Sequence, residues 1–356
     1  TGNDGNIFVN GENISIDSIS FSNINIEDGG EDDLFGDNPP EDISADADGV
    51  NSRSGEVRLR ANNDINIEEA ISSESISLLE LKAGRNLNVN ADIDTSAGNG
   101  DISLEANWGE ADPNIREAGP GNLTFAEGVT INAGGGNVEI LMGSFGDSSN
   151  VGNITLSNVL TSGDLFVNAA GGNILRSSEN SLLTSTTATL ETFGEGSVGS
   201  PEEPLRLSAD ESLDATAGSG GVFLTSPTQG LTVNNVSTTG GDVELAVETE
   251  GDLSVVEGIS TVVEGGDGGN IFLEAPGNID TTSANLNASS QTGSGGEVEL
   301  TAVGEVAAAS ITTTGSQSGG NITLTSETAD VDTTAGNLDV SSPSGNDGNI
   351  FINGEN

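Results

Sequence analysis

The chain has 356 residues, and 57 acidic against 8 basic side chains give it a formal net charge of −49. So acidic a surface repels phosphate groups, which excludes nucleic acid and anionic membrane surfaces as partners. The chain contains no Cys and no His, so it offers no disulfide, thiolate or imidazole chemistry. All 8 cations lie within the first 206 residues, and the last 150 residues carry none.

The chain opens on short apolar runs with the period of two that marks β-strands, at residues 7–9, 14–16 and 19–26. Residues 27–49 break this pattern with paired glycines, paired prolines and ten acidic side chains, which predicts a surface loop. Strand-like runs resume at Val57. Further surface loops are predicted at 107–120 and 194–204, where Gly and Pro again interrupt the alternation.

From residue 220 onward one phrase recurs, consisting of glycine, one further residue, and then apolar-any-apolar. Its first apolar residues are spaced by 21, 28, 27, 24 and 28 positions and are Val222, Val243, Ile271, Val298, Ile322 and Ile350. A unit of this length at nearly constant spacing is typical of solenoids, and the apolar alternation is that of a strand. We therefore predict an all-β fold, a right-handed parallel β-helix (β-solenoid) of about 12–16 turns, each of roughly 21–28 residues, running through 1–356 as one shaft.

Two local features refine this prediction. Many strands follow a Gly-Asn pair, as at Gly121, Gly269 and Gly320, and we expect these glycines to supply positive φ at the corners of the turns. The asparagines are expected to form hydrogen-bonded ladders from turn to turn. Within 242–248 the apolar side chains should face the core and the acids should face solvent.

One stretch resembles a known family. It reads Gly-Ser-Val-Gly-Ser-Pro-Glu-Glu-Pro-Leu-Arg-Leu-Ser-Ala at 196–209, then Leu-Asp-Ala at 213–215 and Val-Phe-Leu at 222–224. It is similar to the turns of filamentous haemagglutinin-like exoproteins, bacterial surface β-helices exported by two-partner secretion, and Gly-Gly-Asn-Ile-Thr-Leu at 319–324 points the same way. The resemblance implies a secreted, extracellular or cell-surface shaft that acts as an adhesin, fibre or biofilm component. The family's amino-terminal secretion domain is not recognisable in these residues.

Residues 1–13 recur as residues 344–356, with eleven of thirteen positions identical and an offset of 343. Two turns that share a consensus by chance would agree less closely, so we predict one period of a tandem or head-to-tail repeat that stacks end to end on itself. The residues expected at this interface are Ile7, Phe8, Val9, Ile350, Phe351 and Ile352.

Calcium is the one cofactor that the sequence suggests. Residues 44–49 resemble half of an EF-hand loop, and residues 265–272 resemble a single nonapeptide calcium repeat. The candidate Ca²⁺ ligands are Asp32, Asp33, Asp37, Asp46, Asp48 and Asp267. Like charges facing each other across strands are destabilising, which also favours divalent counter-ions, whereas the alternative is simply an acidic, soluble surface.

The patterns predict a structural or adhesive function without enzymatic activity, and the resemblance implies that it is exercised in an extracellular bacterial fibre. The alternatives are a Ca²⁺-dependent module that binds surface polysaccharide and, third, a β-helix enzyme that cleaves polysaccharide. Cleavage would require a paired carboxylate site, whereas the acids here are spread over outward positions.

Three sets of side chains have two interpretations each. Arg53, Arg58 and Arg60 are expected to hold the acidic segment by ion pairs rather than to bind a ligand. Trp108 is expected to pack on the solenoid rather than to stack on a sugar. The phenylalanines within the recurring phrase either form one outward stripe or are buried, and they are Phe8, Phe223, Phe272 and Phe351.

Overall fold

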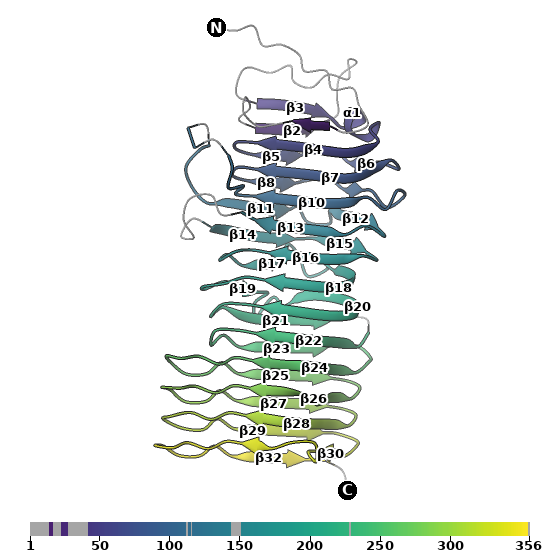
Figure 1. The fold of residues 1–356 in the computed structure, drawn as a ribbon. Coiled ribbons are helices and arrows are strands. Elements are labelled where there is room, and N and C mark those ends of the chain that lie inside the picture. Colours follow the sequence, from purple (N-terminus) through teal and green to yellow (C-terminus); the bar gives the residue numbers. More distant parts are fainter. Residues whose placement is uncertain are drawn as a thin grey trace. The chain divides into compact units, whose positions relative to one another are not determined.

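The computed structural model describes residues 14–16, 23–27, 42–111, 113–114, 116–143, 151–227 and 229–354. The chain divides into two compact units, Thr1–Thr186 and Thr187–Asn356. Each unit consists of parallel strands stacked turn upon turn, and the chain holds about 12 turns in all (Figure 1). The predicted parallel β-solenoid is therefore confirmed. One short helix, α1 (Ala47–Asn51), is present, and no helix among the described residues is long and apolar enough to cross a membrane.

The first unit has three series of strands, and each strand pairs in parallel with the equivalent strand one turn away. The first series is β1 (Ile14–Ile16), β4 (Gly55–Ala61), β7 (Ile76–Ala83), β10 (Asp101–Ala106), β13 (Val138–Met142) and β16 (Asp164–Asn168). The second is β2 (Asn23–Glu27), β3 (Asp42–Asp46), β5 (Ile65–Ile67), β8 (Leu87–Val89), β11 (Gly121–Phe125), β14 (Val151–Leu156) and β17 (Ile174–Arg176). The third is β6 (Ile71–Ser72), β9 (Ile93–Asp94), β12 (Thr130–Gly134) and β15 (Asn158–Thr161).

The second unit alternates two kinds of strand. The Gly-led series contains the recurring phrase and consists of β21 (Gly221–Ser226), β23 (Val243–Val247), β25 (Ile271–Ala275), β27 (Val298–Ala302), β29 (Ile322–Ser326) and β32 (Ile350–Asn353). The bent series has register shifts within its strands and consists of β22 (Leu231–Ser237), β24 (Leu253–Ser260), β26 (Ile279–Asn287) and β28 (Val306–Thr312), followed by β30 (Val331–Asp332) and β31 (Leu338–Asp339). The remaining strands are β18 (Leu183–Glu191), which crosses the boundary between the units, β19 (Ser197–Val198) and β20 (Leu205–Thr216).

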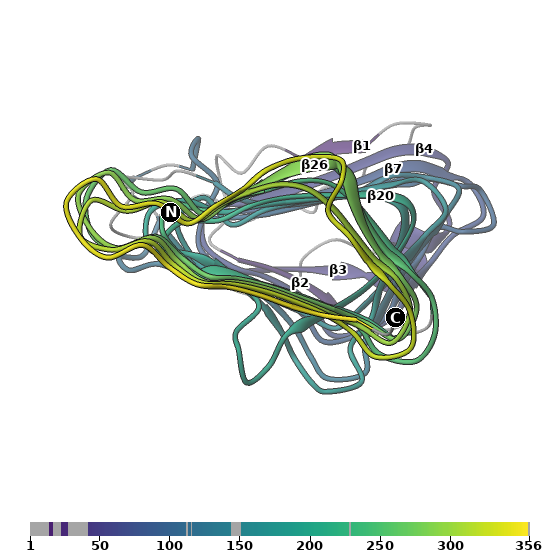
Figure 2. The same cartoon turned by 90° about the horizontal axis from the view of Figure 1, so that it is seen from below.

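The Gly-led series has the register that the sequence spacing predicts. Val243 pairs with Val222 on one side and with Ile271 on the other, and the pairing continues in register through Ile322 to Ile350. Viewed end on, the turns of the second unit superimpose closely (Figure 2). The loops that vary in length between turns therefore leave the strand register unchanged.

The core lies inside the turns and is made of aliphatic side chains from alternate strand positions. In β23, Val243 and Leu245 are fully buried, whereas Glu244 is exposed, as the alternation predicts. Five or so such side chains per turn each gain roughly 1.5–3 kcal/mol from burial, which stabilises a turn only when its neighbours cover it.

The glycines of the Gly-Asn pairs have a different role from the one predicted. None of Gly121, Gly269 and Gly320 has positive φ. A Cβ at Gly320 would instead lie 2.0 Å from the carbonyl oxygen of Gly296, one turn away. These glycines are needed because the turns approach each other too closely there for any side chain.

The asparagine ladders are confirmed. In most of their bonds a backbone N–H donates to a side-chain oxygen, and in a few a side-chain amide donates, as that of Asn88 does to Asn66 Oδ1 at 2.7 Å. The Asn153 N–H donates to Asn122 Oδ1 at 3.0 Å, and the Asn173 N–H donates to Asn153 Oδ1 at 2.9 Å. In the second unit, the Asn270 N–H donates to Asp242 Oδ1 at 2.7 Å in the same manner. Each Asn or Asp thus satisfies the first backbone donor of the next turn.

The predicted loops are confirmed in part. No strand or helix lies among the described residues of 107–120. The loop predicted at 27–49 is wrong for its last residues, because β3 pairs in parallel with β2 and leads into α1. Its apolar residues, Ile43 and Ala45, stand in register with Ile24 and Ile26, a match that the surrounding acids hide in the sequence. The loop predicted at 194–204 contains the two-residue strand β19.

Candidate functional site

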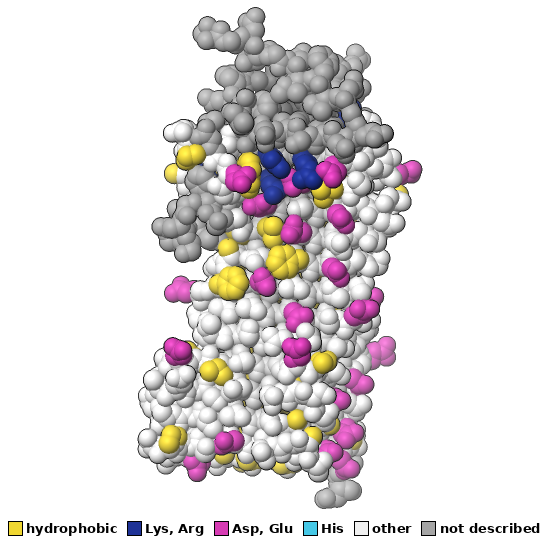
Figure 3. Space-filling model, in the orientation of Figure 1, with side chains coloured by type: hydrophobic (Ala, Val, Ile, Leu, Met, Phe, Trp, Pro, Cys, Tyr) yellow, Lys and Arg dark blue, Asp and Glu magenta, His cyan; other side chains and the backbone are white. Residues whose placement is uncertain are grey.

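The cations of the first unit form an ion-pair cluster across β4, β7 and β10. Glu80 lies between the guanidinium groups of Arg58 and Arg60, each 3.0 Å away, and Lys82 pairs with Glu105 at 3.1 Å. Figure 3 shows Lys and Arg side chains gathered on this face, with acidic side chains beside them. The sequence predicted that Arg58 and Arg60 pair with the acidic segment 27–49. Their described ion-pair partners are instead side chains of the solenoid strands.

Glu80 and Glu105, two of the carboxylates in this cluster, differ in their pKa. Burial alone would raise the pKa of Glu80, but hydrogen bonding to Arg60 and the charges of Lys82 and Arg58 hold it below the ordinary value. Burial raises the pKa of Glu105, and Lys82 only partly offsets this effect. Glu80 is therefore the carboxylate that the surrounding cations stabilise.

A second set of ion pairs anchors the insertion at 107–120. Arg85 pairs with Asp64 at 2.7 Å and also with Glu117 of the insertion. Arg116 donates to the carbonyl oxygen of Gly84 at 2.6 Å. Trp108 is only 7% exposed, and the Arg60 guanidinium lies 5.6 Å from the centre of its ring, which confirms the packing interpretation.

The second unit has many acidic side chains and almost no cations. In several columns the strand register keeps these acidic side chains apart from one another. A column here is the set of residues that pair from turn to turn, and acidic residues alternate with neutral ones along it. Such columns are Asp242–Asn270–Glu297–Asn321, Glu244–Phe272–Glu299–Thr323 and Ser254–Asp280–Ala307–Asp332. Where Val306 pairs with Val331, the residues that precede them, Glu305 and Asp330, are both acidic. In the first unit, Glu27 pairs with Asp46. The alternation removes many of the like-charge contacts that favoured divalent counter-ions.

The phenylalanines of the recurring phrase do not share one environment. Phe223 is buried, Phe272 is partly exposed and Phe351 is 51% exposed, whereas Phe8 lies outside the described residues. In their column, Glu244 lies between Phe223 and Phe272, and Glu299 follows Phe272. The described strands of the second unit therefore carry no continuous aromatic stripe.

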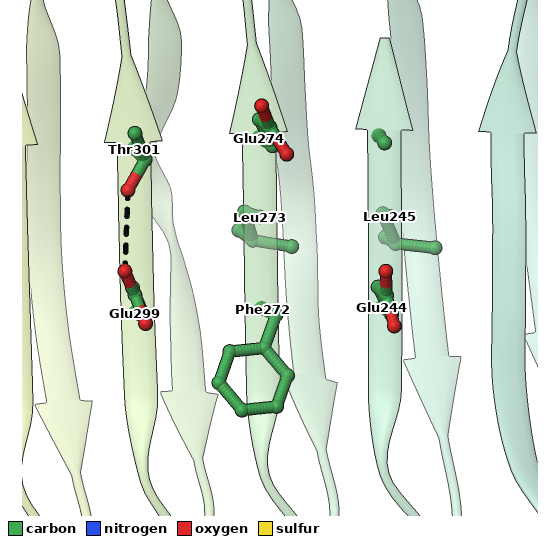
Figure 4. A pocket seen from close by; sticks show the side chains of 8 residues that line it. Glu244, Leu245, Phe272, Leu273, Glu274, Glu299 and Thr301 are labelled. Carbon is green, nitrogen blue, oxygen red and sulfur yellow. Dashed lines mark hydrogen bonds between the residues drawn. The ribbon is translucent and has the colours of Figure 1, made fainter. Parts of the chain in front are cut away.

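A shallow hollow of about 400 Å³ lies around Phe272 on the outer face of β23, β25 and β27 (Figure 4). Glu244, Glu274 and Glu299 contribute carboxylates from these three strands. The Thr301 hydroxyl donates to Glu299 Oε1 at 3.5 Å. We call this hollow the Phe272 groove.

The candidate calcium ligands are not brought together in the described residues. Asp32, Asp33 and Asp37 lie outside them, and of Asp46 and Asp48 only the backbone is described, in β3 and α1. Asp267 accepts a hydrogen bond from the Ser294 N–H at 2.8 Å. No group of three or more acidic side chains able to hold a metal ion occurs in the described part of the chain.

The last strand exposes side chains that are buried in the turn before it. Ile350, Phe351 and Ile352 are 41%, 51% and 49% exposed, whereas Ile322 and Leu324 of β29 are fully buried. Ile7, Phe8 and Val9, the other half of the predicted interface, lie outside the described residues. Among the described residues, the side chains of β32 are covered on one side only, by β29.

No protein-family description matches this chain, and neither a curated protein nor a solved structure was found to match it.

Sequence reasoning missed the ion-pair cluster and the Phe272 groove. Both depend on which residues pair across turns. Aligning 55–61 with 76–83 by their apolar residues would have placed Glu80 beside Arg58. Aligning β23, β25 and β27 by the recurring phrase would likewise have placed Phe272 between two glutamates.

Proposed function

We propose that the chain is a structural and adhesive shaft segment of an extracellular bacterial surface fibre, one that continues end to end with a further copy of itself and catalyses no reaction. The observation that carries the proposal is the recurrence of residues 1–13 at 344–356, in a strand that stacks in the same register as every Gly-led strand before it. A solenoid can be extended by a further turn without changing its geometry.

The strand edges have the polarity that such a junction needs. Among the described residues, β32 pairs only with β29, and β3 pairs only with β2, in both cases in parallel. A strand added to either edge in the same direction would continue the ladder and cover the apolar side chains of β32. A head-to-tail contact of this kind produces an open filament rather than a closed ring.

The secreted location rests on the resemblance to filamentous haemagglutinin-like exoproteins. Residues 196–224, which carry that resemblance, fall within β19, β20 and β21, as turns of a solenoid should. Surface polysaccharide stays a proposed ligand of such a shaft.

The proposal is tested by sedimentation velocity over a range of protein concentrations in 0.15 and 0.5 M NaCl. Native chain is expected to form larger species as concentration rises, more readily in higher salt because screening weakens the repulsion between acidic copies. Ile352→Asp should abolish this, whereas Phe193→Asp should not, although Ile352 and Phe193 are equally exposed at 49% and 50%. Equal effects of the two substitutions, or a monomer at every concentration, would overturn the proposal.

A further inference from the structure

The Phe272 groove arises from the side chains that the register places next to one another. Glu244, Phe272 and Glu299 form one column, and Ala246, Glu274 and Thr301 form the column beside it. The small side chains of Ala246 and Thr301 flank Glu274 and leave the space that forms the hollow.

The groove has one aromatic side chain and acidic borders. The partly exposed Phe272 ring lies on the outer face, whereas the side chains of Leu245 and Leu273 are buried in the core and give the groove no apolar floor (Figure 4). Glu244 and Glu274 are exposed and make no hydrogen bond or ion pair with the described residues around them. The groove thus combines an aromatic surface with acceptors of hydrogen bonds.

The charge of the groove indicates the kind of ligand. No Lys or Arg follows Arg206 in the sequence, so this stretch of chain supplies no counter-charge of its own. Within the described residues these carboxylates do not form a group that could hold a metal ion. A fitting ligand therefore carries its positive charge on an extended organic group with several donors. A second copy of this chain, with net charge −49, does not fit.

We infer that the Phe272 groove binds arginine side chains of an extended basic segment of a partner protein. A guanidinium is planar, so it can stack on the Phe272 ring while its N–H groups pair with the carboxylates of Glu274 and of Glu244 or Glu299. Lysine has a compact, strongly hydrated charge that cannot make the same paired contacts. This lateral contact is independent of the end-to-end assembly proposed above.

The inference is tested by calorimetric titration of the full chain with the capped peptide Gly-Arg-Gly-Arg-Gly at 0.15 M NaCl. Phe272→Leu and Glu274→Gln should each weaken binding about two- to fivefold, the range of an exposed cation–aromatic contact. Glu305→Gln makes the same charge change outside the groove and should alter binding by less than about twofold. The lysine counterpart of the peptide should bind more weakly than the arginine peptide.

Four results would overturn the inference. The first is a loss of binding in Glu305→Gln as large as that in Glu274→Gln, which would mean diffuse attraction to an acidic surface. The second is unchanged binding by Phe272→Leu, and the third is equally tight binding of the lysine and arginine peptides. The fourth is Phe272-dependent binding of glucosamine oligomers without binding of the arginine peptide. Denaturation midpoints of all variants establish that the fold is retained.

Discussion

Replacing Asn270 by Asp tests whether alternating charge along the columns stabilises the second unit. Asn270 stands between Asp242 and Glu297, and it accepts the Glu297 N–H at 2.8 Å through Oδ1. Aspartate keeps this acceptor and nearly the same shape, so the substitution adds a charge and little else. It converts the column from alternating acids into three acids in succession.

The expected loss follows from the spacing between turns. Two unit charges about 4.8 Å apart repel by about 0.9 kcal/mol in water. Screening with a Debye length of about 8 Å at 0.15 M salt reduces this to about 0.5 kcal/mol per neighbour, so two neighbours cost about 1 kcal/mol. At 1 M salt, where the Debye length is about 3 Å, the total falls to about 0.4 kcal/mol. Both values lie within the range of cross-strand pairs, about 0.2–1 kcal/mol each.

The assay is denaturant unfolding at pH 7, followed by circular dichroism, at both salt concentrations. The matched control is Asn153→Asp, because Asn153 occupies the same ladder position between the neutral residues Asn122 and Asn173. The control should lose little stability at either salt concentration. Equal losses in the two variants, or a loss in Asn270→Asp that does not shrink with salt, would refute the reasoning.

Three further predictions concern stability. Gly320→Ala should lower the free energy of unfolding by about 1–3 kcal/mol, because its Cβ would lie 2.0 Å from a backbone oxygen. Gly265→Ala has open space around it and should lower that free energy by less than about 0.5 kcal/mol. Similar losses in the two variants would contradict the close approach of the turns at Gly320. Glu80→Gln should lose roughly 2 kcal/mol at pH 7, whereas Glu105→Gln should be nearly neutral. The surrounding cations lower the folded-state pKa of Glu80, so its contribution to the free energy of unfolding is present above the ordinary Glu pKa of about 4.3. This contribution is lost as pH falls through the lower folded-state pKa. The difference in stability between the two variants should therefore vanish in acid. If segment 27–49 binds Ca²⁺, a chelator lowers the melting temperature of native chain in calcium, and a chain with the acids of that segment amidated shows no such change.

The fold was predictable because the apolar residues alone determine the register. Val243 and Ile271 belong to turns of different length, yet both must point inward, and only one alignment of the strands allows this. The role of glycine was not predictable in the same way. A Gly before a strand is required either where φ is positive or where the backbones of two turns lie too close for a side chain. Gly320 is of the second kind, and only the distance between the turns reveals this.

The surfaces were harder to predict than the core. Outward residues carry no pattern of their own, so Glu80 and Arg58, 22 positions apart, become neighbours only once the register is known. Phe272 and Glu274 contribute to one groove for the same reason. The strand β3 was missed because acids surround its two apolar residues.

The most direct test of the central claim is cryo-electron microscopy of concentrated native chain. The proposed assembly predicts single-file filaments in which the layer spacing of about 4.8 Å continues without a break from β32 of one copy into the first turns of the next. Filaments joined side by side, or isolated particles at every concentration, would contradict the claim that this solenoid continues end to end.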